Sequence, residues 1–228
     1  MSVEADPPIV EVLDERTPAA QSALGLIMDT FPAHERQPLA ELRSEIAEKR
    51  LGLLAAYDFH LFAAFGDSGP DKYAVAAAVG VYLEGVNAGF VNYLAVRPAV
   101  RGRGHGRALR RRLVEQLRSD ARDAGFDDLA WVIGEVRPDN DWLRRLVREK
   151  SAIPFDLTYY HPAPIPGAAD ERFVLYRQPV GDVREALPSE LVQRLLYAIY
   201  RRAYRVSYPL ERPAFRDMLA ELKTRGEQ

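Results

Sequence analysis

The sequence has no cysteine among its 228 residues, and this absence excludes several kinds of chemistry. Without a thiol the chain forms no disulfide, offers no thiolate to a metal and has no cysteine nucleophile, so acyl transfer through a cysteine acyl-enzyme is excluded. The four histidines also lack the spacing of a metal site. The sequence therefore predicts neither a metal centre nor covalent catalysis by cysteine.

Long apolar runs are missing as well. No segment approaches the roughly 20 consecutive apolar residues that cross a bilayer as a helix, so we expect no membrane partner. Residues 1–6 are acidic and lack the basic and apolar regions of a signal peptide. Together these two absences predict a cytoplasmic protein.

Neither sign of charge dominates, because the formal net charge is only -2. An arginine-rich stretch over residues 101–112 looks like a nucleic-acid-binding tract on charge alone. A chain without a positive field does not attract a polyanion, however, and the helix expected there keeps an apolar face. We therefore interpret these arginines as a solvated surface and expect no nucleic acid partner.

Apolar periodicity predicts an alternation of strands and helices along the chain. With 47% hydrophobic residues, a chain of this length can bury one core and carry an appendage. The nearly continuous apolar run at residues 129–136 is typical of a central strand. The expected strands are residues 8–13, 59–65, 73–83, 90–96, 129–136, 153–160 and 172–176, and the expected helices begin at or near Thr17, Pro38, Gly106, Asn140, Ser189 and Pro213.

The most informative segment lies between an expected strand and an expected helix and reads Arg101-Gly102-Arg103-Gly104-His105-Gly106. A glycine-rich loop that opens a helix leaves backbone N–H groups free at the positive end of the helix dipole. Glycine lets the backbone approach a phosphate closely because no Cβ stands in the way. The segment therefore predicts a site for a phosphorylated ligand.

Two common phosphate loops fit this segment poorly. The Walker loop ends in Gly-Lys-Ser/Thr, whereas Gly106 is followed by Arg107 and Ala108. The dinucleotide fingerprint requires Gly-x-Gly-x-x-Gly, and the third glycine comes one residue early here. The segment instead resembles the acetyl-CoA loop of the GNAT N-acetyltransferase superfamily, Arg/Gln-x-x-Gly-x-Gly/Ala, with Arg101, Gly104 and Gly106 at the defining positions.

The order of the expected elements over residues 8–178 is also similar to that superfamily. The resemblance implies an α/β fold, the GNAT fold, in which helices flank a mixed central sheet. We expect a GNAT acetyltransferase domain over residues 1–180 and a C-terminal helical extension over residues 181–228 that packs on it. The implied activity is N-acetyltransfer by direct attack of a primary amine, of a small molecule or a peptide, on acetyl-CoA as co-substrate. The alternative is a catalytically degenerate domain that binds acyl-CoA as a sensor or assembly module.

The resemblance also implies which residues bind acetyl-CoA. The main chain at the end of the strand before the loop would align the pantetheine arm, with the Val96 N–H donating to the thioester carbonyl. The loop would hold the pyrophosphate, and Asn140 matches an asparagine that contacts the CoA arm in many members. The residues assigned in this way are Leu94, Ala95, Val96, Arg101, Gly102, Arg103, Gly104, His105, Gly106 and Asn140.

The sequence departs from the superfamily at the residue that would protonate the departing thiolate. Members usually have a tyrosine about six or seven residues after the asparagine, where this chain has Leu146 and Val147. Tyr159 and Tyr160 on the next expected strand are candidate catalytic replacements, and side-chain alternation lets only one of them face the cleft. The alternative, which we favour, is that both are ordinary strand aromatics.

A general base is predicted at Glu135, near the C-terminal end of the expected central strand, where ligands bind in sheets of this kind. A buried carboxylate there would accept the amine proton or hold a cationic amine. The strand could also have reached solvent by Glu135, in which case the residue has no such role. Glu84, near a hairpin end, and Glu35, between the first two helices, are weaker candidates for the substrate side.

Two amphipathic helices follow the part of the chain that resembles the superfamily. We expect their apolar stripes to pack on the protein's own core; the alternatives are a homodimer face and a cover for the substrate pocket. A run of four tyrosines, Tyr197, Tyr200, Tyr204 and Tyr208, could instead form a partly exposed binding surface. The apolar stripes consist of Val192, Leu195, Leu196, Ile199 and Ala203, and of Phe215, Met218, Leu219 and Leu222.

Overall fold

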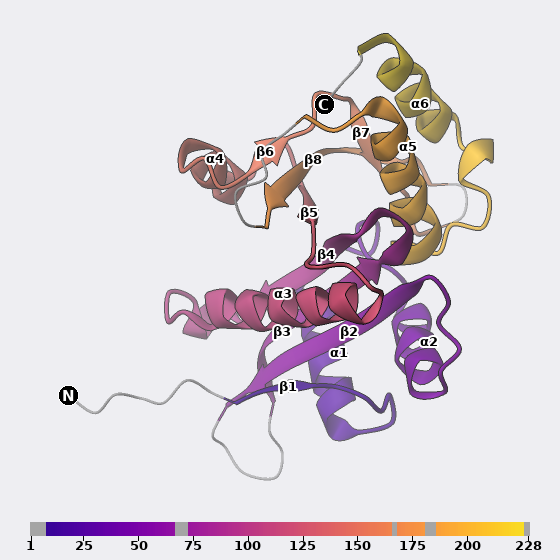
Figure 1. Ribbon diagram of the computed structural model, residues 1–228. Coiled ribbons are helices and arrows are strands. Elements are labelled where there is room, and N and C mark those ends of the chain that lie inside the picture. Colours follow the sequence, from indigo (N-terminus) through magenta and orange to yellow (C-terminus); the bar gives the residue numbers. More distant parts are fainter. Residues whose placement is uncertain (1–7, 67–72, 166–167, 181–185, 226–228) are drawn as a thin grey trace.

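A mixed β-sheet forms the centre of the computed structural model, which describes residues 8–66, 73–165, 168–180 and 186–225 (Figure 1). The strands are β1 (Ile9–Glu11), β2 (Tyr57–Phe65), β3 (Ala74–Leu83), β4 (Ala88–Val96), β5 (Trp131–Val136), β6 (Ile153–Pro154), β7 (Tyr159–His161) and β8 (Glu171–Pro179). The helices are α1 (Pro18–Thr30), α2 (Leu39–Arg50), α3 (His105–Asp123), α4 (Asp141–Arg148), α5 (Ser189–Ala198) and α6 (Pro213–Arg225). Short helical turns are η1 (Glu84–Val86), η2 (Pro98–Val100), η3 (Ile199–Ala203, of π type) and η4 (Pro209–Glu211). Within the described ranges no helix is both long enough and apolar enough to cross a membrane.

The strands follow the order β1-β2-β3-β4-β5-β8-β6, and β7 pairs with β8 beside this path. The neighbouring strands are antiparallel except β4 and β5, which run parallel. The glycine-rich loop and helix α3 connect those two parallel strands. This is the mixed sheet with flanking helices that the sequence predicts, so the predicted fold class is confirmed.

The segment predicted as one strand over residues 153–160 forms two short strands, β6 and β7, which both pair with β8. Between them the backbone turns toward α6, where the Thr158 N–H donates to the Glu221 carboxylate at 3.1 Å. Because this contact draws the chain away from β8, the ladder is interrupted. The sequence pattern did not reveal the interruption because the partner lies 63 residues further on.

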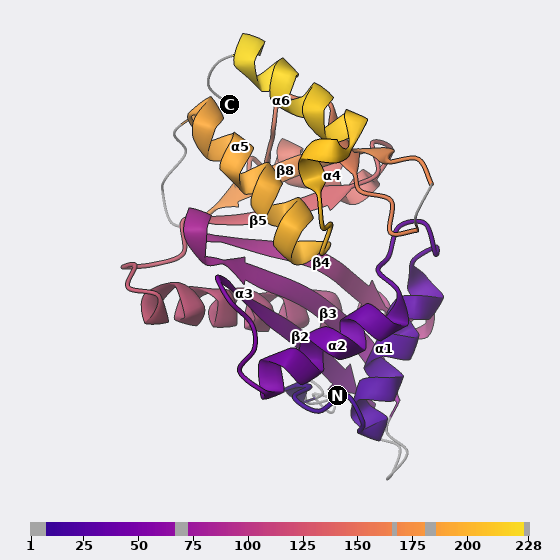
Figure 2. The same cartoon turned by 90° about the vertical axis from the view of Figure 1, so that its right-hand side faces the viewer.

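Helices cover both faces of the sheet (Figures 1 and 2). The apolar stripe of α3 packs on β2, β3 and β4 from one face, and α1, α2 and α5 pack on the opposite face. The stripes predicted for α5 and α6 are buried in the same core as α1, with Leu219 partly buried at its edge. Of the tyrosine run, Tyr200 and Tyr204 are buried, whereas Tyr197 and Tyr208 are exposed. The domain boundary near residue 180 stays a prediction.

β4 and β5 separate part of the way along their length. Their parallel pairing ends at Val91 and Gly134, although β4 continues to Val96 and β5 to Val136. A bulge leaves Asn92 of β4 without a partner on β3, and a bulge bends the strand that contains it. The two strand ends therefore enclose a gap in the sheet.

A buried ion-pair network ties β1, β2, α2 and α3 together away from this gap. The His60 ring on β2 has Nδ1 2.7 Å from Glu11 Oε1 and Nε2 2.8 Å from Asp120 Oδ2. Lys49 Nζ reaches the same Glu11 oxygen at 2.8 Å. Burial and the Lys49 ammonium lower the pKa of His60, but the Asp120 and Glu11 carboxylates outweigh them and raise that pKa above its ordinary value.

We predict that the His60 network stabilises the fold more at low pH than at high pH. The folded protein binds the His60 proton more tightly than the unfolded chain does, so the stabilisation is complete below about pH 6.5 and is lost as the pH rises through the folded-state pKa. The difference in free energy of unfolding between wild type and His60→Gln should therefore shrink with rising pH, by up to about 1.4 kcal/mol per unit of pKa shift. Urea unfolding between about pH 6 and about pH 9 checks this; a difference that stays constant across that range would contradict it.

Candidate active site

A cavity of about 600 Å³ occupies the gap between β4 and β5. Residues from α1, β4, the glycine-rich loop, α3, β5, α4 and β8 meet around it, so the gap brings together segments that lie far apart in the sequence. Its lining is formed by Thr30, Phe31, Val91, Asn92, Leu94, Val96, Arg101, Arg110, Glu135, Val136, Asn140, Trp142 and Tyr176.

The glycine-rich loop has the geometry of an anion site. Gly102 and Gly104 adopt φ angles of +82° and +90°, which L side chains rarely adopt. The Ala108 N–H makes the first α3 hydrogen bond to the Gly104 carbonyl, so the N–H groups of residues 105–107 have no acceptor within the helix. The first turn contains no acidic side chain, and His105 Nδ1 is buried without a partner among the described residues. These features fit a bound phosphate group.

The residues assigned to acetyl-CoA lie in three different environments. Leu94, Val96, Arg101 and Asn140 line the cavity. Ala95 faces the opposite side of β4, where it is buried in the core against α1 and α5. The remaining loop residues continue from Arg101 to the start of α3 at the cavity edge. Asn140 also caps α4, because its side chain accepts a hydrogen bond from the Trp142 N–H at 2.9 Å.

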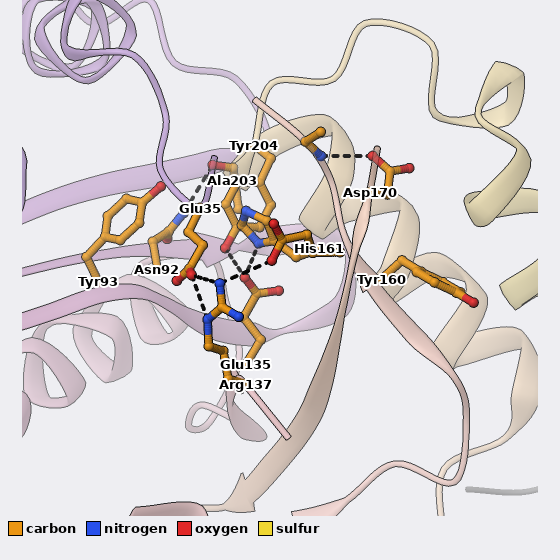
Figure 3. Close-up of polar contacts among 12 residues, drawn as sticks. Glu35, Asn92, Tyr93, Glu135, Arg137, Tyr160, His161, Asp170, Ala203 and Tyr204 are labelled. Atoms are coloured by element: carbon orange, nitrogen blue, oxygen red, sulfur yellow. Dashed lines mark hydrogen bonds and ion pairs between the residues drawn. The ribbon is translucent and has the colours of Figure 1, made fainter. Parts of the chain in front are cut away.

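Glu135 lies on β5 one residue beyond the last residue pair between β4 and β5, and it lines the cavity although its side chain is only 4% exposed. His161 Nδ1 approaches Glu135 Oε1 at 2.5 Å, and the Tyr204 hydroxyl donates to the same oxygen at 2.6 Å (Figure 3). Oε2 has no hydrogen-bond partner among the described residues. The strand has therefore not reached solvent at this position, and one carboxylate oxygen remains available to a ligand.

The charge state of Glu135 follows from these contacts. Burial raises its pKa, but the His161 imidazolium and the surrounding hydroxyl donors outweigh burial and hold that pKa below its ordinary value. The carboxylate in turn outweighs burial at His161 and raises the pKa of that imidazole. Each partner therefore favours the charged form of the other.

Irregular backbone places the groups around Glu135. The π-turn η3 follows α5 and presents Tyr204, whose ring packs edge-on against Phe90 and His161. Asn92, at the β4 bulge, donates its side-chain amide to the Ala203 carbonyl at 3.1 Å (Figure 3). π-turns are rare and are often found at functional sites. Here the two irregularities contact each other beside the cavity.

Neither tyrosine proposed as a thiolate acid lines the cavity. Tyr159 is fully buried in the core of the α1 and α5 face. Tyr160 points away from Glu135 (Figure 3), and its backbone N–H and carbonyl contact Met218 and Tyr200. The alternation that separates the two side chains is as predicted. The Tyr159 hydroxyl lies near Glu135 and helps to lower the pKa of that carboxyl, but neither tyrosine is part of the cavity lining.

The two weaker candidates, Glu35 and Glu84, lie at different ends of the sheet. Glu35 bonds to Arg137, which follows β5 and also contacts His34 and Glu171. Ligand atoms of Glu35, His34 and Glu171 come within 4.8 Å of one another, but the Arg137 guanidinium already bonds to all three side chains. This group is an ion-pair cluster beside Glu135 (Figure 3). Glu84 is exposed in η1, at the end of β4 opposite the cavity.

Sequence reasoning missed His161 and Tyr204 as partners of Glu135. His161 was discoverable, because it lies two residues after Tyr159 and therefore shares its face of the strand. Tyr204 was noticed only as part of a tyrosine run. Its position depends on the π-turn, which shifts the side-chain phase at the end of α5 and which no local pattern predicted.

We predict strong coupling between Glu135 and His161 in a double-mutant cycle. His161→Gln removes the cation from a buried carboxylate and should lower the free energy of unfolding by about 3–5 kcal/mol. The double variant with Glu135→Gln no longer contains the buried charge, so it should lose less than the sum of the single losses. Urea unfolding at neutral pH checks the four proteins; additive losses would show that the two side chains are not an ion pair.

Comparisons with known proteins agree on one family. A model described as the acetyltransferase (GNAT) family matches residues 22–150, which is more than half of the chain. A protein from Bacteroides thetaiotaomicron assigned to the GNAT family has a structure similar to this one, with a TM-score of 0.62 at 16% identity over 88% of this chain and 99% of that chain. The ribosomal-protein-alanine N-acetyltransferase from Brucella melitensis gives 0.51 at 17% identity over 76% and 99% of the two chains.

The search of curated proteins found no match. At identities this low the structural similarity concerns the fold alone, and the family assignment rests on the family model. The fold, the loop and the matched residues lead to the same conclusion: this chain belongs to the GNAT family of acetyltransferases.

Proposed function

We propose that the protein is an N-acetyltransferase that moves the acetyl group of acetyl-CoA to a primary amine by direct attack. The observation that supports this most strongly is the gap between β4 and β5. One cavity there is lined both by Arg101 of the anion-binding loop and by the buried carboxylate of Glu135. A thioester anchored by its phosphates at one side of such a gap would present its carbonyl to a nucleophile held at the other.

The loop and the free edge of β4 bind the co-substrate. The N–H groups at the start of α3 and the Arg101 guanidinium hold the pyrophosphate. Beyond Val91, β4 has no β5 partner, so main-chain groups on that edge, from Asn92 to Val96, are available to the pantetheine amides. The Val96 N–H donates to the thioester carbonyl, where negative charge develops during attack.

Glu135 acts on the attacking amine. Its carboxylate is ionised at neutral pH because His161 lowers its pKa, and its Oε2 has no other partner among the described residues. When the amine nitrogen bonds to the acetyl carbon it becomes positively charged, and a carboxylate at this position stabilises that charge and accepts the proton. The acceptor is a primary amine of a small molecule or a peptide, and Glu35 with its Arg137 partner lies beside the route to it.

A domain that binds acyl-CoA without turnover is the competing proposal. It is favoured by Leu146 and Val147, which stand on α4 where family members usually have a tyrosine. The buried, ionised Glu135 favours the enzyme, because burying a carboxylate costs free energy that simple CoA binding does not require.

We predict that Gly104→Glu abolishes binding of CoA. The added carboxylate would stand where the loop holds the pyrophosphate and would repel it. A matched control is Gly125→Glu, because Gly125 has a φ of +91° with nothing near its Cβ and lies at the far end of α3, about 30 Å away. Calorimetry with CoA should detect binding to wild type and to the control only; equal binding by all three proteins would remove the loop from the site.

We also predict that Glu135→Gln lowers kcat by about 10²-fold or more while the Kd for CoA stays unchanged, because the amide cannot accept the amine proton. Turnover can be followed as released CoA with a thiol reagent, since the cysteine-free chain contributes no thiol of its own. An unchanged kcat would exclude Glu135 as the base. A wild type that binds CoA but gives no turnover with any amine would favour the non-catalytic domain.

A further inference from the structure

The departing CoA thiolate needs a hydrogen-bond donor, and most donors that line the cavity already have acceptors. The Thr30 hydroxyl donates to the Leu26 carbonyl at 2.7 Å. The Asn92 amide donates to the Ala203 carbonyl, and the Arg110 guanidinium binds Gln178. These groups are occupied in holding the protein together.

Among the described residues, Tyr176 on β8 is one of the exceptions, together with the Trp142 indole and the Asn140 amide nitrogen. It lines the cavity, is 4% exposed, and its hydroxyl makes no hydrogen bond with another residue in the described part of the chain. Its ring lies edge-on against Trp142 of α4 at 5.7 Å between centroids, so packing fixes its orientation. A rigid tyrosine with an unused hydroxyl is therefore aimed into the ligand gap.

Gly134 is the reason why the Tyr176 hydroxyl can reach this position. The two residues are direct partners across β5 and β8, and a Cβ built on Gly134 would come within 2.3 Å of the hydroxyl oxygen. The hydroxyl thus occupies the space that any side chain at position 134 would fill. Gly134 is also the last β5 residue paired with β4, so the hydroxyl lies where the two strands diverge.

We propose that the Tyr176 hydroxyl donates a hydrogen bond to the CoA sulfur as the thiolate departs. The inference rests on the proposed acetyltransfer. In that step the amine nitrogen bonds to the acetyl carbon, the C–S bond breaks and its electron pair goes to sulfur, and the proton lost by nitrogen goes to Glu135. CoA leaves as the thiolate, stabilised by Tyr176, and no further reactant is needed.

The positions of Tyr176 and Glu135 fit a donor at the sulfur and a base at the amine nitrogen. Tyr176 packs with α4, whereas the Glu135 contacts His161 and Tyr204 belong to the opposite face of the sheet. Burial raises the pKa of Tyr176, although the nearby Arg110 guanidinium lowers it in part. The phenol is therefore protonated at neutral pH, as a donor must be.

The test is Tyr176→Phe, which keeps the ring and removes only the hydroxyl. With the primary amine that gives the fastest CoA release in a panel of small amines, amino acids and short peptides, we expect kcat to fall about 10²-fold. The Kd for CoA should be unchanged. Tyr82→Phe is the matched control, because Tyr82 is also a buried strand tyrosine and its hydroxyl bonds to Asn87 at the hairpin end, away from the cavity. This control should turn over like wild type.

A second readout separates a role at sulfur from a structural role. Thiophenyl acetate releases a less basic thiolate than acetyl-CoA does, so its transfer needs less help from a donor. With thiophenyl acetate, the kcat/KM of wild type should therefore exceed that of Tyr176→Phe by no more than about threefold. Equal losses with both thioesters, or no loss with acetyl-CoA, would overturn the assignment of Tyr176 while leaving the acetyltransferase intact. A wild type without turnover would overturn the proposed function, and this inference with it.

Rescue provides the last comparison. Leu146 of α4 packs in the same small cluster as Tyr176, so Leu146→Tyr adds a hydroxyl next to the ring that Tyr176→Phe leaves without one. Added to Tyr176→Phe, it should recover part of the lost kcat with acetyl-CoA. Recovery would support a requirement for a donor at sulfur. The requirement would be contradicted if Tyr176→Phe lost as much activity with thiophenyl acetate as with acetyl-CoA and Leu146→Tyr did not restore the activity.

Discussion

The end of pairing between β4 and β5 is the constraint on which the rest of the site depends. Inside a sheet each strand normally satisfies the N–H and C=O groups of its neighbour, and unsatisfied buried groups are costly. Here the ladder stops at Val91 and Gly134 while both strands continue. The free edges can be satisfied by a ligand with amide groups of its own, which is what a pantetheine arm offers. The bulge at Asn92 makes the divergence abrupt, so the opening lies beside the glycine-rich loop.

Strand alternation then determines which chemistry meets at the gap. Gly134 and Glu135 are neighbours on β5, so their Cβ directions point to opposite faces of the sheet. On one face the missing side chain of Gly134 makes room for Tyr176, and on the other face Glu135 is held by His161 and Tyr204. In a continuous sheet these two environments would be separated by backbone. Because β4 has moved away, a single ligand can contact both.

The local parts of the site could be predicted from the sequence, and the distant contacts could not. Glycine spacing between a strand and a helix was sufficient for the loop, and a carboxylate in an apolar strand was sufficient to single out Glu135. Tyr176 was hidden because its role depends on facing a glycine across β5 and β8, a register that the sequence does not specify. Tyr204 was hidden because a π-turn displaces it from the regular helical stripe. The assignment of Tyr159 and Tyr160 relied on proximity in sequence to α4, but β7 lies on the far side of β8 from the gap.

The surroundings of Glu135 depend on sequence outside the segment that the family model matches. The family model ends at residue 150, yet His161 comes from β7 and Tyr204 from the turn after α5. Burial raises the pKa of Glu135, and His161 and Tyr204 are among the groups that oppose this effect and hold the pKa below its ordinary value. Residues after 150 thus supply the cation and the hydroxyl that keep the carboxylate ionised in a buried position. The contact between Asn92 and Ala203 joins this C-terminal turn to the bulge that opens the gap, so the segment that tunes Glu135 is attached to the place where the cavity begins.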